Sequence, residues 1–239
     1  MTRRATLTEM IYPDTPDSAE LAMQWAQSAT SEILDLIWRG FDAFRANHLS
    51  RVNSAQLRES EQPERSLVDL HFQEILLLWK AKTDGYSSFI PHHERPEMAS
   101  RTSGKAKPPA NDMGFVSVAN LRWFWAVEAK VIFSPNALSE YLKDVKGKFI
   151  PGRASPLIGD GGMIGYLLRR NGEDTVFGNL AKQLDQTLHP FPRFEDRPHR
   201  VSRHSRTGAP NLRLHHMMMA CVEVRKRNGK KRLFRKMCG

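Results

Sequence analysis

The sequence lacks several features that would place it in a broad class of proteins. Its two cysteines, Cys221 and Cys238, do not make a disulfide framework, which favours a reducing compartment. No apolar run approaches the length of a transmembrane helix, and the opening MTRRATLTEM has no signal-peptide core. No internal repeat is present, and the glycines at 159–162 lack the Lys-Ser/Thr of a phosphate-binding loop. We therefore expect a cytoplasmic protein with no membrane partner and no built-in motor.

Positive charge is abundant but unevenly distributed along the chain. The 239 residues carry a formal net charge of +10. Residues 197–239 contain thirteen Lys and Arg and one acid, Glu223, so this segment carries +12 and the preceding 196 residues carry −2. Such a basic segment attracts phosphate backbones without reading sequence, although charge runs are more commonly solvated tails. Within it, residues 225–236 are expected to form a charged hairpin or a flexible tail around Asn228-Gly229.

The most informative segment is Trp123–Phe133, an apolar run in which Glu128 is the only acid. Its Trp, Phe, Val and Ile content predicts a largely buried strand. Because strand side chains alternate between faces, Glu128 and Lys130 project to one side and Ala129 to the other. The Ala129 carbonyl is then available as an oxygen ligand. A buried charged pair is costly unless it is matched by other charges or binds a metal.

A second carboxylate, Asp112, precedes Glu128 by sixteen positions. Asp112 follows a turn-forming Pro108-Pro109 stretch and opens the short apolar segment 113–118, so the two strands are expected to form a hairpin. Asp112, Glu128 and the Ala129 carbonyl, completed by water, are the oxygen ligands that Mg²⁺ prefers, with Mn²⁺ as an alternative. A purely structural ion pair is the competing interpretation. A second acid-x-Lys triplet, Asp144-Val145-Lys146, lies in a helical pattern and is interpreted as a helix surface pair.

The order of elements predicts a mixed α/β core with one crossover. After the hairpin, Ser134 and Pro135 mark the start of a helix that extends to about Phe149. A glycine-flanked apolar run at 161–168 predicts another buried strand, and a second helix is expected at about 175–186. An apolar stretch at 211–224 predicts a late strand that ends the fold.

This order resembles the PD-(D/E)xK superfamily of nucleases, also called restriction-endonuclease-like. The resemblance covers roughly residues 67–190, and Asn111 stands where the proline of the family name would precede Asp112. It implies an α/β restriction-endonuclease-like mixed sheet flanked by helices, with Asp112 and Glu128 as ligands of Mg²⁺ and Lys130 as a catalytic residue that stabilises phosphate charge. It also implies a metal-dependent endonuclease, acting on DNA in preference to RNA, of the kind found in bacterial restriction or phage-defence systems. Such proteins act as homodimers or with a partner subunit that supplies specificity.

Several members of the superfamily carry a further glutamate on the helix before the first strand. Here residues 66–80 have a strong helical pattern that is apolar on nearly all sides, and Glu74 is the candidate additional metal ligand on it. The alternative is a structural Glu-His or Glu-Arg pair, for which His71, one turn earlier, is a candidate partner.

The chain is divided into two parts on this interpretation. Residues 1–65 are expected to form an N-terminal helical extension, with one long or two shorter amphipathic helices over 17–48 and Gly40 as a candidate break. Residues 66–239 are expected to form the nuclease core with its basic C-terminal strand region. The polar segment 92–107 is expected to be a loop that leads into the Asp112 strand.

Two other classes of function stay open at this point. A non-catalytic nucleic-acid-binding module would use the basic C-terminal region and would not depend on Glu128. A regulatory subunit of a larger complex would dock through its N-terminal helices and would expose an apolar helical face. The complete set of Asp112, Glu128 and Lys130 favours catalysis over both.

Overall fold

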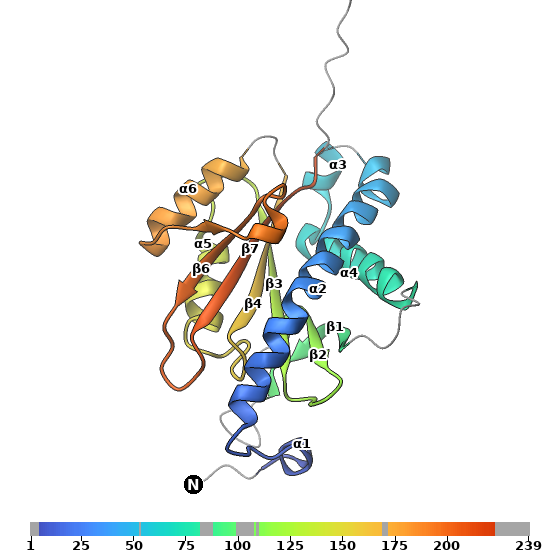
Figure 1. The fold of residues 1–239 in the computed structure, drawn as a ribbon. Helices are drawn as coiled ribbons and strands as arrows, with labels where there is room; N and C mark the ends of the chain where they lie inside the picture. The colour runs from blue at the N-terminus through green and yellow to red at the C-terminus, as the bar shows by residue number, and fades with distance from the viewer. Residues whose placement is uncertain are drawn as a thin grey trace, which may run out of the picture.

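The structure, a computed structural model, describes residues 5–52, 54–81, 88–98, 108, 110–168 and 172–222. Seven strands within these ranges form one mixed sheet, with the order β1-β2-β3-β4-β7-β6-β5 (Figure 1). The elements are α1 (Leu7–Ile11), α2 (Ser18–Asn47), η1 (Leu49–Arg51), α3 (Ser54–Glu59), α4 (Pro63–Ala81), β1 (Phe89–Pro96), β2 (Ala110–Ser117), β3 (Phe124–Ile132), α5 (Ser139–Asp144), the π-helical turn η3 (Val145–Phe149), β4 (Asp160–Leu167), α6 (Glu173–Leu184), β5 (His189–Pro190), η4 (Pro192–Phe194), β6 (His199–His204) and β7 (Leu212–Ala220).

The sheet combines antiparallel hairpins at both sides with a parallel centre. Strands β1, β2 and β3 pair antiparallel, β3, β4 and β7 pair parallel, and β7, β6 and β5 pair antiparallel. The parallel pair β3–β4 is joined by the segment that contains α5, as a crossover requires. The predicted α/β class is therefore confirmed, and so is the predicted order of strand, strand, helix, strand and helix for β2, β3, α5, β4 and α6.

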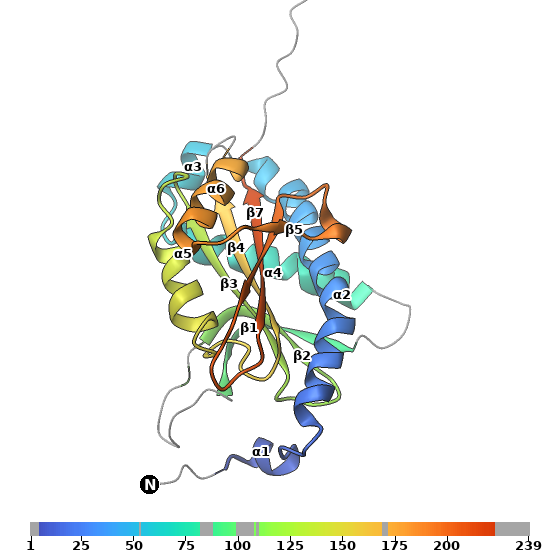
Figure 2. The ribbon, with the colours of Figure 1, turned by 60° about the vertical axis from the view of Figure 1, so that its left-hand side comes forward.

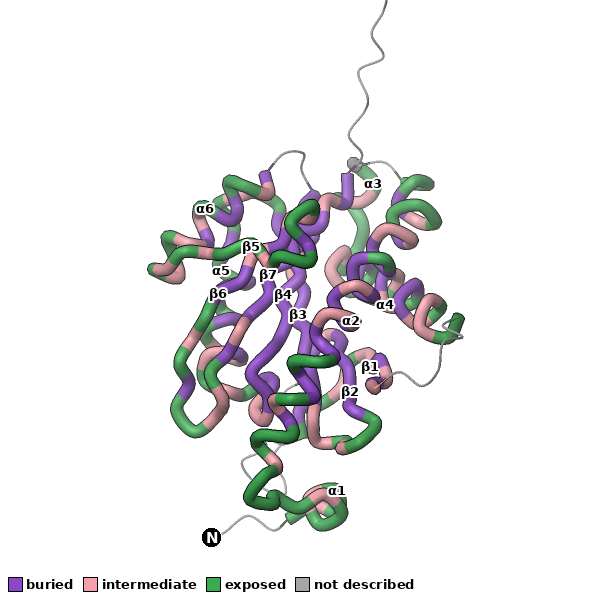
Figure 3. Tube along the Cα trace, in the orientation of Figure 1, coloured by how far each residue is buried: buried purple, intermediate pink, exposed green. Residues whose placement is uncertain are grey.

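Helices cover both faces of the sheet and create two hydrophobic cores. One core joins α2 and α4 to one sheet face, and the other joins α5 and α6 to the opposite face (Figure 2). The central strand β4 is buried along its whole length, as expected for a parallel strand between two helical layers (Figure 3). The strand predicted at 211–224 is confirmed as β7, whose residues alternate between the two cores.

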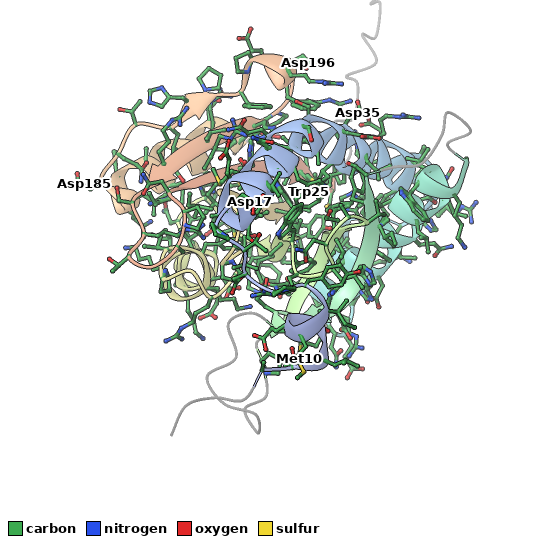
Figure 4. All side chains as sticks on the ribbon, turned by 60° about the horizontal axis from the view of Figure 1, so that its bottom comes forward. Met10, Asp17, Trp25, Asp35, Asp185 and Asp196 are labelled. Atoms are coloured by element: carbon green, nitrogen blue, oxygen red, sulfur yellow. The ribbon has the colours of Figure 1, made fainter. Side chains whose placement is uncertain are left out.

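Helix α2 is the longest element of the structure and belongs to the main core. Its buried face includes Trp25, whose indole N–H donates to the carbonyl of Ser88 over 3.2 Å. Figure 4 shows Trp25 pointing into the molecule, whereas Met10 lies apart on α1. The sequence-based division at residue 65 falls inside α4, and α2 shares one core with α4 and the sheet.

Gly40, the candidate break, does not interrupt the N-terminal helix, so the alternative of one long helix is confirmed. It lies inside α2, where a Cβ atom would stand 2.5 Å from the side chain of Ile75 on α4. The glycine therefore allows α2 and α4 to approach closely, and tertiary packing offsets its low helix propensity.

Two other expectations about local structure are wrong. Residues His92–Pro96 belong to the edge strand β1 and do not form a loop; residues 99–107 of that predicted loop lie outside the described residues. Helix α5 begins at Ser139 and not at Pro135, because Ala137 donates its N–H to the carbonyl of Ser134 in a preceding turn. The charged segment predicted at 225–236 also lies outside the described residues.

No helix in the described ranges combines the length and apolarity needed to cross a bilayer.

Several histidines are fully buried as neutral side chains. His71 Nε2–H donates to the carbonyl of Ile37 over 2.9 Å, and its Nδ1 lies 2.8 Å from the hydroxyl of Tyr166. Burial lowers the pKa of His71 to about 4 and the pKa of His216 to about 3. Both rings are neutral in the folded protein at any pH above these values, while the unfolded chain takes up protons below about 6.5.

These histidines predict a loss of stability in acid. Between pH 6.5 and 4 the unfolded chain binds the proton that folded His71 excludes, so the free energy of unfolding falls by about 1.4 kcal/mol per pH unit for this group. His71→Gln removes that contribution, and urea unfolding from pH 6.5 to 4.5 should show a slope shallower by this amount. The exposed His189→Gln is the matched control. Equal slopes for wild type and His71→Gln would contradict the assignment.

Candidate active site

Strands β2 and β3 stop pairing at one point and separate into a fork. Their antiparallel register runs from Val116 opposite Phe124 to Met113 opposite Val127. Beyond that pair, the N–H of Ala129 donates to Asp112 Oδ2 over 2.7 Å. Two residues further on, the N–H of Val131 donates to Glu64 Oε2 over 3.2 Å. Carboxylates thus replace the missing strand partner on this side of β3.

Glu128 lies at the base of the fork. Continuing the register by one residue places it opposite Asp112, and its side chain is 1% exposed. Lys148 Nζ lies 2.7 Å from Glu128 Oε1, an ion pair without the angles of a hydrogen bond. Burial, and then the charge of Asp112, raise the pKa of Glu128 to about 8 against the opposing effect of Lys148. The positive charge of Lys148 therefore does not fully stabilise the ionised form of Glu128 against burial and the charge of Asp112.

Lys130 lies on the same face of β3 as Glu128, as strand alternation predicts. Its Nζ is 2.8 Å from Glu64 Oε1 and 3.3 Å from Asp144 Oδ2. Burial works to lower its pKa, but the hydrogen bond to Glu64 and the nearby carboxylates outweigh burial and raise it. Lys130 is thus held as a permanent cation at the mouth of the fork.

Asp144 and Lys148 complete the group from the helical layer above the sheet. Asp144 is the last residue of α5 and Lys148 is in the π-helical turn η3 that follows. Their side chains pair at 3.4 Å, and both contact the residues from β3. The interpretation of Asp144 and Lys146 as a surface pair is wrong for Asp144, which is buried; Lys146 alone is exposed.

We refer to these six side chains as the fork cluster: Glu64, Asp112, Glu128, Lys130, Asp144 and Lys148. Sequence reasoning identified Asp112, Glu128 and Lys130, and the structure brings them together. It missed Glu64, Asp144 and Lys148, which come from helices. The spacing of four residues from Asp144 to Lys148 was the available signal, since such pairs share a helix face.

The backbone of Ala129 also faces the fork. Its N–H points toward Asp112, and the N–H and C=O of one strand residue project to the same edge of the strand. The Ala129 carbonyl oxygen is therefore directed to the side where β2 has separated from β3. This orientation places it among the carboxylates, as its predicted role as an oxygen ligand requires.

Glu74 lies elsewhere, contrary to the role suggested for it. It is ten residues beyond Glu64 on α4, about 15 Å along the helix axis. Its Oε1 accepts a hydrogen bond from Asn47 over 3.1 Å and lies 2.8 Å from His48 Nε2. Glu74 thus ties the end of α2 to α4. Glu74 thus forms a structural Glu-His pair, which was the alternative to a metal role, and its partner is His48 and not His71.

The donor set of the fork cluster suits a divalent cation in charge and in chemistry. Its four carboxyl groups and two ammonium groups leave two formal negative charges when all are ionised. Oxygen atoms Glu128 Oε1 and Asp144 Oδ2 are buried and have no hydrogen-bond partner among the described residues. Within the described ranges, no group of three or more His, Cys, Asp or Glu side chains is placed so that it could hold a metal ion. Mg²⁺ is commonly held by only one or two carboxylates together with water and substrate phosphate, and Asp112 and Glu128 are the carboxylates predicted for it.

Comparison with known proteins adds no relative. No protein-family model matches the sequence, and no curated protein and no solved structure matches it significantly.

The raised pKa of Glu128 predicts a stability gain when its charge is removed. Between pH 4.5 and 8 the carboxyl of Glu128 keeps its proton in the folded protein and loses it in the unfolded chain. The free energy of unfolding therefore decreases by roughly 1.4 kcal/mol for each unit by which the pH rises, from this group alone. Glu128→Gln lacks this dependence. In EDTA, its free energy of unfolding should exceed that of wild type increasingly from pH 5 to 8, as measured by urea titration.

The exposed Glu140→Gln is the control, because Glu140 pairs only with the exposed Lys143 among the contacts described. It should follow the wild-type curve. A Glu128→Gln protein that is less stable than wild type at pH 8 would mean that Lys148 stabilises the carboxylate more than burial destabilises it.

Proposed function

We propose that this protein is a metal-dependent endonuclease that hydrolyses phosphodiester bonds, with DNA as the favoured substrate. The observation that carries the proposal is the fork itself. Asp112 and Glu128 are neighbours across it, and Lys130 lies on the same strand face two residues from Glu128. An acid at the end of one strand and a Glu-x-Lys on the next are the residues that the PD-(D/E)xK resemblance requires.

The residues of the fork cluster have distinct roles in this proposal. Asp112, Glu128 and the Ala129 carbonyl would hold Mg²⁺ or Mn²⁺, which when bound would polarise the phosphodiester and promote ionisation of water. Lys130 offers an ammonium group to the phosphate oxygens, where negative charge builds up during hydrolysis. Glu64 and Asp144 keep Lys130 charged and fix the position of its ammonium group.

We further propose that α4, β1–β3, α5 and β4 form a restriction-endonuclease-like core. The mixed sheet with an antiparallel hairpin followed by a parallel strand across α5 supports this. So does Glu64, since it stands on the helix before the first strand and contacts Lys130. Glu64 is therefore proposed for the helix glutamate of this resemblance, for which the sequence had offered Glu74 as a candidate.

A nucleic-acid substrate is supported by charge. The fork cluster is negative, so a nucleic acid needs a basic surface elsewhere on the chain to bind. Residues 197–239, which carry a net charge of +12, supply that positive charge. The preference for DNA over RNA comes from the resemblance, as does the proposed role in restriction or phage defence with a homodimer or a partner subunit.

Plasmid cleavage tests the proposal directly. Wild-type protein should cut plasmid DNA with Mg²⁺ or Mn²⁺ and not with EDTA. Asp112→Asn, Glu128→Gln and Lys130→Met should each lower the rate by about 100-fold or more, because each removes charge stabilisation at the reacting phosphate. Glu140→Gln should retain the wild-type rate.

The outcomes separate the alternatives. Cutting that survives Glu128→Gln would place the activity at another site and reject the proposal. DNA retained on a shift gel without cutting under any metal would favour the non-catalytic binding module, or a regulatory subunit that requires a partner.

The basic C-terminal region generates a separate prediction about binding. Deleting residues 225–239 removes eight Lys and Arg. DNA affinity should fall, and the dependence of log K on log salt should become shallower, because fewer phosphate counterions are released. Fluorescence anisotropy with Glu128→Gln protein, at several salt concentrations, measures both. An unchanged salt slope would mean that this segment is a solvated tail with no part in binding.

A further inference from the structure

The fork cluster already contains a cation close to its most buried carboxylate. Lys148 Nζ lies 2.7 Å from Glu128 Oε1 and 3.4 Å from Asp144 Oδ1. Among the residues that the structure describes, Glu128 Oε1 has no hydrogen-bond partner, and the Lys148 ammonium group is the positive charge at contact distance from it. A divalent cation that binds Glu128 through this oxygen has to take the place of Lys148.

We infer that Lys148 is an internal counter-ion that occupies the cation position in the metal-free protein and withdraws to Asp144 when a divalent cation binds. The inference rests on the proposed function and names how the same site is regulated. It makes Lys148 a positioning residue that competes with the metal, and it makes Asp144 the carboxylate that receives the displaced ammonium group.

The local backbone suits a movement of the side chain alone. The carbonyl of Lys148 accepts hydrogen bonds from the N–H groups of Arg153 and Ala154, over 2.8 and 2.9 Å. These bonds hold the π-helical turn in place, and such turns are frequent at functional sites. Asp144 is within ion-pair distance already, so a flexible lysine stem can leave Glu128 without losing every partner.

The same ion pairs also account for the finding that the described part of the chain has no group of three or more acids and histidines open to a metal. Two ammonium groups, from Lys130 and Lys148, lie between the carboxylates of the fork cluster. They balance the repulsion that Asp112, Glu128 and Asp144 would otherwise exert on one another. The Lys148 ammonium group and a divalent cation would repel each other strongly if both contacted Glu128 Oε1. Without Lys148, the same carboxylates would therefore attract a divalent cation more strongly.

The test is the affinity of the protein for Mn²⁺, measured by titration calorimetry without DNA. Lys148→Met keeps the apolar stem and removes the charge. It should bind Mn²⁺ at least about tenfold more tightly than wild type, because the competing ammonium group is gone. Lys146→Met is the matched control, because it changes the net charge equally at a position two residues away. Lys146 is exposed, and its Nζ donates a hydrogen bond to the carbonyl of Gln183. The Mn²⁺ affinity of this variant should therefore equal that of wild type.

A second readout covers the fold of the variant. Thermal unfolding with and without Mn²⁺ should show a larger stabilisation by the metal in Lys148→Met, or in Lys148→Gln if the methionine variant does not fold. Adding Glu128→Gln to either variant should abolish the gain, because the metal would lose the oxygen that Lys148 had covered.

Each result decides between the claims. Equal or weaker Mn²⁺ binding in the folded Lys148 variants would overturn the counter-ion role, as would an equal gain in Lys146→Met. If wild-type protein cuts DNA with metal while the Lys148 variants bind Mn²⁺ unchanged, this inference alone fails. If neither wild type nor the variants bind Mn²⁺, the counter-ion role fails together with the metal-dependent mechanism.

Discussion

Strands β2 and β3 separate after the pair Met113 and Val127, which leaves backbone N–H groups of β3 without a strand partner. The side chains that accept hydrogen bonds from these N–H groups determine the composition of the fork cluster. An unsatisfied buried donor destabilises a fold by about 1–3 kcal/mol. Asp112 and Glu64 accept these hydrogen bonds, so both carboxylates contribute to folding as well as to the charge of the fork. Their charge beside the buried Glu128 then calls for cations from Lys130 and Lys148. Stability and the proposed chemistry therefore draw on the same carboxylates.

The part of the cluster on the sheet could be predicted from the sequence because it follows from local rules. Strand alternation put Glu128 and Lys130 on one face, and a hairpin with an antiparallel register brought Asp112 opposite Glu128. The apolar surroundings of Glu128 indicated its burial, and the structure agrees. These inferences needed only the period of a strand and the position of a turn, both of which a single sequence contains.

The helical part of the cluster depends on tertiary placement, which local patterns do not contain. Glu64 is in the first turn of α4, and which end of that helix meets β3 is decided by packing of α2 and the sheet. Asp144 lies where α5 passes into a π-helical turn, so a regular helical period assigned it to the surface incorrectly. The strand β1 was missed for a related reason: its polar, proline-containing sequence resembles a loop until β2 provides a partner.

The edge strands of the sheet have a consequence for self-association. On one edge, β1 contains Pro91 and Pro96, and on the other, β5 is two residues long and ends in Pro190. Proline has no N–H to donate, and short or charged edge strands resist pairing with another chain. Neither edge therefore presents a continuous template for strand addition. Among the described residues, both edges of the sheet are therefore poor templates for the edge-to-edge strand pairing that leads to aggregation.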